Sequence, residues 1–139
     1  MAEAKGKGRP VARPLAPHAQ IYRWPITMGT SILHRVTGVG LAGGTLLLAW
    51  WLVAVSMGPG SYAEFAGIAA SWFGRLVLFG FTLALVYHAL NGIRHLMWDV
   101  GVGLNLKAAN ASGITVYVLT VIATFLIWLS AYQSMGAWQ

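Results

Sequence analysis

Two histidines, an arginine and an aspartate lie within one mostly apolar stretch, LVYHALNGIRHLMWD, which runs from Leu85 to Asp99. Because no residue from Leu76 to Ile93 carries a fixed charge, this stretch is expected to form part of a membrane-spanning helix. Ionisable groups inside a bilayer segment are costly and mark functional sites. On a helix, small residues and groups that bind metals or protons share about a third of the circumference. These positions are Ala84, His88, Asn91, Gly92, His95 and Asp99.

His88 is the histidine that lies deepest in this span. A lone histidine in an apolar helix is usually a hydrogen-bonded structural residue, and that interpretation stays open. The alternative is a haem ligand, because neutral imidazole is a common axial ligand of non-covalent haem. Ala84 and Gly92, a turn to either side, leave room for the edge of a macrocycle. His95 lies about seven residues later, roughly 10 Å along the axis, where a haem propionate would need a partner.

Polar side chains also gather in SILHR, the segment from Ser31 to Arg35 that opens the first apolar span. Ser31, His34 and Arg35 are three or four residues apart, so they share one side of a helix. His34 and Arg35 could therefore join His95 in binding two propionates. The alternative is that Arg35 only extends to the lipid headgroups. The residues that continue this side are small enough to leave space for a large partner: Gly38, Ala42 and Thr45.

The composition predicts an all-α membrane protein with three transmembrane helices. The chain has 139 residues, of which 58% are hydrophobic and 9% are charged, whereas about a quarter are charged in soluble proteins. Each of three stretches without charge can supply the roughly 20 apolar residues that cross a bilayer. The helices are expected near 32–57, 71–98 and 113–133, with a loop between the first two, and 31–139 is expected to form one transmembrane domain. Gly40 and Gly44 are expected to allow close helix packing.

Residues 1–30 are expected to form a basic tail and a short interfacial segment. The tail should lie loosely on anionic lipid headgroups, and Tyr22 and Trp24 favour the membrane interface. The net charge of +6 reflects this tail and does not indicate nucleic-acid binding. Because basic residues favour the inner side, the N-terminus and the second loop are expected to face the cytoplasm, or the matrix in a mitochondrion. The absence of cysteine excludes disulfides, iron–sulfur ligation and covalent haem attachment.

Two motifs together resemble a known family. The segments RPLAPHAQIYRWPIT, SILHRVTGVGL and YHALNGIRHLMWD are similar to the larger cytochrome b membrane-anchor subunit of succinate dehydrogenase. The motifs S-x-x-H-R-x-T-G and H-x-x-x-G-I-R-H carry the resemblance, which covers about two-thirds of the chain. It implies one part of a heteromeric helix bundle that also contains a smaller anchor subunit, an iron–sulfur subunit and a flavoprotein subunit. The expected location is the bacterial cytoplasmic membrane in preference to the mitochondrial inner membrane.

The resemblance also implies roles for individual residues. His88 matches a haem b axial ligand, the second ligand coming from the smaller anchor, and His34, Arg35 and His95 match positions near the propionates. Ubiquinone is expected at the inner boundary, where it would be reduced with electrons from succinate, and Asp99 is a candidate for proton delivery. The residues expected to bind the quinone are Ser31 and Arg35, with Trp24 and Ile32 in the apolar wall.

Two other classes of protein remain open. A quinol:fumarate reductase anchor has the same architecture and works in the opposite direction. A non-redox scaffold or transporter subunit would use its histidines only for hydrogen bonding. Because the chain has no flavin motif and no cysteine, succinate oxidation itself is assigned to partner subunits.

Overall fold

The computed structural model describes residues 22–136, and four helices account for most of them. The helices are α1 (Ile26–Met57), α2 (Pro59–Ala70), α3 (Trp72–Asp99) and α4 (Leu106–Ser134). Helices α1, α3 and α4 are long and apolar enough to cross a membrane. With 28 to 32 residues, each is about 42–48 Å long, which exceeds the roughly 30 Å hydrocarbon core. The prediction of an all-α membrane protein with three spans is therefore confirmed.

Two of the spans begin earlier than expected. Helix α1 begins at Ile26 instead of near residue 32, directly after Pro25, the N-cap residue, whose backbone is extended. Helix α4 begins at Leu106 instead of near residue 113, because the Asn105 side chain accepts a hydrogen bond from the Ala108 N–H at 2.8 Å. Helix boundaries set by such caps do not follow hydropathy. The predicted basic tail lies outside the described residues, and so does the part of the predicted interfacial segment that precedes Tyr22.

The prediction of a loop between the first two spans is wrong, because most of this segment forms the 12-residue helix α2. Gly58 ends α1, and it has a φ of 102°, which side-chain-bearing residues rarely adopt. Pro59 then opens α2, since proline is tolerated at the first position of a helix, where its missing N–H needs no partner. Ser71 caps α3 by accepting a hydrogen bond from the Gly74 N–H at 3.1 Å.

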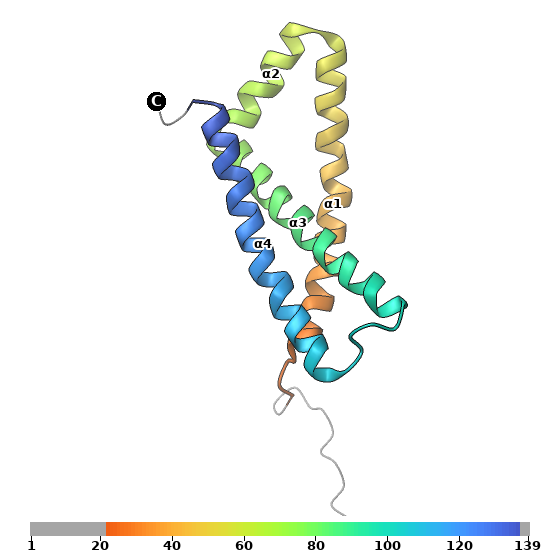
Figure 1. Ribbon diagram of the computed structural model, residues 1–139. Helices are drawn as coiled ribbons and strands as arrows, with labels where there is room; N and C mark the ends of the chain where they lie inside the picture. The colour runs from red at the N-terminus through yellow and green to blue at the C-terminus, as the bar shows by residue number, and fades with distance from the viewer. Residues whose placement is uncertain (1–21, 137–139) are drawn as a thin grey trace, which may run out of the picture.

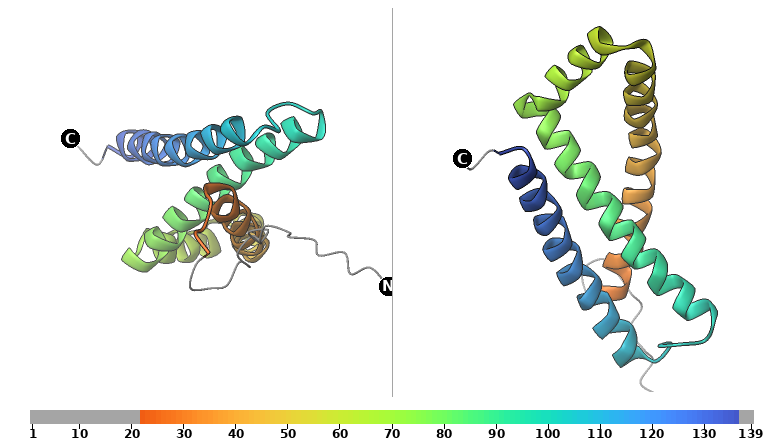
Figure 2. Two further views of the ribbon diagram at one scale, coloured as in Figure 1. Left: turned by 90° about the horizontal axis from the view of Figure 1, so that it is seen from below. Right: turned by 45° about the horizontal axis from the view of Figure 1, so that its top comes forward.

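Helix α3 packs against both α1 and α4 (Figure 1). Helices α1 and α3 diverge toward one end of the molecule, where α2 connects them, as both side views show (Figures 1 and 2). The start of α1, the end of α3 and the start of α4 are all at the other end, where the last turns of α3 extend beyond α1 (Figure 1). We call this the α1 N-terminal end. The polar motifs of α1 and α3 are therefore brought to the same end of the bundle.

The interior of the bundle is small, and about as many of its buried residues are polar as apolar. Buried apolar residues are few, whereas long apolar side chains such as Val39 and Leu46 are more than 70% exposed and are available to lipid or partner helices. Gly44 packs directly on the Phe81 ring, as close packing predicts, but a Cβ on Gly40 would meet no atom within 4 Å. The buried polar residues are Thr30, Asn91, Arg94, Thr120 and Thr124.

Candidate functional site

Three imidazoles, one from α1 and two from α3, lie together near the α1 N-terminal end. The rings of His34 and His88 are stacked, with centroids 3.9 Å apart and planes inclined by 10°. The ring of His95 lies 5.2 Å from that of His34, and 5.1 Å from that of Trp98, to which it is nearly perpendicular. All three histidines are half-buried. The structure thus unites residues that are about 50 to 60 positions apart in the sequence.

One turn of α1 holds the imidazole of His88. Its Nδ1 atom lies 3.1 Å from the carbonyl oxygen of His34 and 3.2 Å from the hydroxyl oxygen of Thr37. The Thr37 hydroxyl also lies 2.8 Å from the Leu33 carbonyl and 3.0 Å from the His34 carbonyl. A Cβ atom on Gly38 would stand 3.1 Å from His88 Cε1, so glycine leaves the space that the ring uses. His88 is therefore fixed by backbone and side-chain groups of α1.

An unpartnered nitrogen and an open space near these histidines leave room for a further group. His34 Nδ1 is buried and has no hydrogen-bond partner among the described residues, which is unusual for a buried polar atom. A Cβ on Gly92, one turn beyond His88, would meet no atom within 4 Å. No group of three or more His, Cys, Asp or Glu residues within 22–136 is arranged to hold a metal ion.

The residues expected to bind quinone lie around the first turns of α1. Trp24 precedes the helix and is 66% exposed, while Ser31 and Ile32 are half-buried. Arg35 follows Ser31 by one turn and is exposed. Asp99, the last residue of α3, is also exposed. These residues reach the surface of the isolated chain, where a ligand or another subunit could contact them.

Arg94 is the main polar residue that sequence reasoning missed. Its side chain is charged but only 4% exposed. Its Nε donates to Ser112 Oγ at 2.9 Å, and its Nη2 donates to the Ala109 carbonyl at 2.8 Å, both on α4. Its Nη1 donates to Thr30 Oγ1 on α1 at 3.1 Å and to Asn91 Oδ1 at 3.2 Å. Arg94 thus connects the three long helices instead of reaching lipid headgroups.

Arg94 and the residues to which it donates hydrogen bonds form a buried group, the Arg94 cluster, which changes the expected polar face of α3. Its other members are Thr30, Asn91, Ala109 and Ser112. Asn91 is fully buried beside Arg94, and its Nδ2 has no partner among the described residues. His88 and His95 instead lie toward α1, and Asp99 is exposed. The face predicted from helical periodicity is therefore divided between a buried cluster and the histidine site. Small and hydroxyl-bearing residues on α1 and α4 could have indicated that Arg94 is buried: Thr30, Ser112 and Gly113.

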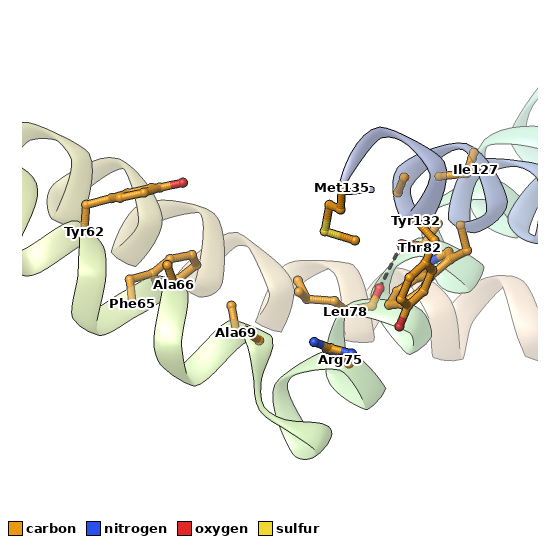
Figure 3. A pocket seen from close by; sticks show the side chains of 13 residues that line it. Tyr62, Phe65, Ala66, Ala69, Arg75, Leu78, Thr82, Ile127, Tyr132 and Met135 are labelled. Carbon is orange, nitrogen blue, oxygen red and sulfur yellow. Dashed lines mark hydrogen bonds between the residues drawn. The ribbon is translucent and has the colours of Figure 1, made fainter. Parts of the chain in front are cut away.

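A cavity of about 460 Å³ lies between α2, α3 and the C-terminal part of α4, away from the histidines (Figure 3). Its lining is mostly apolar and includes Phe65, Leu78 and Met135. Arg75 supplies its charge, and the guanidinium lies 6.0 Å from the centre of the Tyr132 ring. None of the residues expected to bind haem or quinone lines this cavity.

Comparison with known proteins gives one consistent result. The model of the succinate dehydrogenase/fumarate reductase transmembrane subunit family matches residues 9–127. The succinate dehydrogenase cytochrome b556 subunit of Paracoccus denitrificans is 42% identical over 120 residues, which covers 81% of this chain and 92% of that protein. The same subunit of Rickettsia felis is 41% identical over 117 residues, covering 84% and 91%.

A mitochondrial relative shows a similar likeness. The succinate dehydrogenase cytochrome b560 subunit of Sus scrofa is 38% identical over 117 residues, which covers 81% of this chain and 68% of that protein. The family match extends from the N-terminal segment into α4 and so includes both motifs that carry the histidines. The chain therefore belongs to the succinate dehydrogenase/fumarate reductase transmembrane subunit family.

Proposed function

We propose that this chain is the haem b-binding membrane-anchor subunit of a succinate dehydrogenase and forms part of its ubiquinone-reduction site. The relatives are named as cytochrome b subunits of succinate dehydrogenase, which supports both the haem and the complex. The observation that carries the proposal is the cluster of His34, His88 and His95 between α1 and α3. A purely structural role would explain the bonded Nδ1 of His88, but it leaves the buried Nδ1 of His34 without a partner.

The residues of the cluster fit a non-covalent haem. His88 would supply one axial ligand, and the smaller anchor subunit would supply the other. His34, Arg35 and His95 would bind the propionates, since they offer cationic or hydrogen-bond-donating groups near His88. When bound, haem b supplies reversible one-electron storage between the iron–sulfur subunit and the quinone.

The quinone site would be formed at the start of α1. The Ser31 hydroxyl and the Arg35 guanidinium would donate hydrogen bonds to the quinone carbonyl oxygens and stabilise negative charge as electrons arrive. Trp24 and Ile32 would form the apolar wall, and the exposed carboxylate of Asp99 would deliver protons from the adjacent aqueous phase. Ser31 and Arg35 are one turn apart, so one headgroup could contact both.

The chain's partners would supply the chemistry that it lacks. A flavoprotein subunit would oxidise succinate, and an iron–sulfur subunit would pass the electrons on, since this chain has no cysteine for clusters. The chain would anchor both subunits to the bacterial cytoplasmic membrane, together with the smaller anchor. Its N-terminus would face the cytoplasm, so that the α1 N-terminal end lies beneath the iron–sulfur subunit.

The decisive experiment is His88→Ala in the complex purified from membranes. Haem b, measured by the pyridine haemochrome spectrum per assembled complex, is expected to be lost or greatly reduced. Succinate oxidation with a soluble dye should remain, because the catalytic subunits do not contain His88. The matched variant is His95→Ala, which should lose less haem, because water or Arg35 can replace one propionate partner.

Two results would contradict the proposal. Wild-type haem content and ligand spectrum in His88→Ala would show that another residue binds the iron. A wild-type complex without any haem absorption would instead favour a scaffold that uses its histidines only for packing. The family also contains fumarate reductase subunits, and the haem and quinone potentials of the purified complex would distinguish the direction of turnover.

A further inference from the structure

The contacts around His88 Nδ1 determine which ring nitrogen carries the proton. The His34 carbonyl, 3.1 Å away, can only accept a hydrogen bond, so Nδ1 must be the donor. If Nδ1 carried a lone pair, that lone pair would face the carbonyl oxygen. The neutral ring then has its hydrogen on Nδ1 and its lone pair on Nε2. A metal can therefore bind His88 only through Nε2.

Thr37 reinforces this assignment from the same turn of α1. Its hydroxyl lies within hydrogen-bonding distance of two carbonyl oxygens of its own helix, those of Leu33 and His34, and donates its one proton there. The oxygen of the hydroxyl is thus left as an acceptor for His88 Nδ1, at 3.2 Å. Two acceptors of α1 consequently share one Nδ1–H, and both favour the same tautomer.

The same turn also sets the position of the ring. The His34 ring stacks on the His88 ring at 3.9 Å, and Gly38 provides the space beside Cε1. One side of the imidazole is therefore surrounded by a single helix turn. This turn provides a carbonyl, a hydroxyl and a stacked ring, and its glycine leaves space for the imidazole. His34, Thr37 and Gly38 provide these groups, all within the five-residue segment HRVTG.

We infer that Thr37 is a positioning residue that, with the His34 carbonyl, fixes the tautomer and ring orientation of His88 for iron binding. This inference rests on the proposed function, in which His88 is the haem ligand. When the ring nitrogen that does not bind the metal donates a hydrogen bond, the histidine becomes a stronger electron donor to the metal. Thr37 therefore stabilises the ferric over the ferrous state and lowers the haem potential.

The test compares Thr37→Val, which keeps the shape but removes the acceptor, with Thr37→Ser, which keeps the hydroxyl. Haem is followed in the purified complex by its transfer rate to excess apomyoglobin and by a redox titration at the α-band. Thr37→Val is expected to lose haem roughly tenfold faster, at the lower end of the 10- to 100-fold effect of such partners, because the His34 carbonyl remains. Its midpoint potential should rise, and Thr37→Ser should restore both values.

Thr115→Val on α4 is the matched control. The Thr115 hydroxyl donates to the Ala111 carbonyl at 3.0 Å and, unlike that of Thr37, is hydrogen-bonded to no histidine of the described chain. Thr115→Val should therefore leave haem retention and potential unchanged. A wild-type potential and transfer rate in Thr37→Val would overturn the inference, as would equal effects in Thr37→Val and Thr115→Val.

The inference and the proposed function can fail separately. If His88→Ala loses haem while Thr37→Val behaves as wild type, His88 is the ligand and Thr37 does not position it. If His88→Ala retains haem with an unchanged spectrum, the ligand assignment fails, and the Thr37 inference fails with it. Rescue by Thr37→Ser also separates positioning from general packing, since serine restores the hydroxyl but not the methyl group.

Discussion

Replacing Arg94 by methionine should destabilise the helix bundle, because it removes four hydrogen bonds while keeping a similar side-chain length. Three of these bonds cross to another helix, at Thr30, Ser112 and Ala109. Side-chain hydrogen bonds between membrane helices contribute about 0.6 kcal/mol each on average, so these three contribute about 2 kcal/mol. The fully buried Asn91 also loses the donor to its Oδ1, at a cost of about 1 kcal/mol or more. We expect a total loss of about 3 kcal/mol in the free energy of unfolding.

The assay is unfolding of the purified complex by increasing SDS in mixed micelles, followed by circular dichroism. Arg94→Lys should lie between wild type and Arg94→Met, because lysine keeps the charge but cannot contact α1 and α4 together through a planar fork. Arg75→Met is the matched control, since Arg75 is exposed and lies 6.0 Å from the Tyr132 ring centre. Its effect should stay within about 0.5 kcal/mol. Equal stability of Arg94→Met and Arg75→Met would refute the structural role of Arg94.

Two further predictions concern the ligands. Arg35→Lys and Ser31→Ala should each slow succinate:quinone turnover by roughly 10- to 100-fold, as expected when a charged hydrogen bond worth about 1.5–3 kcal/mol is lost in the transition state. Turnover is normalised to assembled complex and to succinate oxidation with a soluble dye, and wild-type rates would show that this turn only anchors the helix. Gly38→Ala should speed haem loss, because its Cβ would stand 3.1 Å from His88 Cε1 and the ring must move by a few tenths of an ångström. Gly40→Ala, with no atom within 4 Å of its Cβ, is the control, and equal haem loss in both would contradict the space argument.

Several structural features could be predicted from local sequence, and others could not. Runs without charge predicted the three spans, since a bilayer requires about 20 apolar residues whatever the tertiary structure. Helix α2 was not predicted, because glycine and proline at positions 58 and 59 are typical of a loop, although proline also favours the first turn of a new helix. The early starts of α1 and α4 were missed because Pro25 and Asn105 act through backbone geometry and capping. Hydropathy detects neither effect.

For the site, the two motifs were sufficient to indicate the family, and the comparisons confirm it. Helical periodicity placed His88 and His95 on one side of α3, because positions seven apart share a face on any helix. The tertiary structure alone decided that His34 stacks on His88 and that one turn of α1 receives Nδ1, since both depend on how α1 crosses α3. It also turned Arg94 inward, because acceptors from α1 and α4 satisfy a buried guanidinium, and no single-helix pattern records which acceptors another helix will bring.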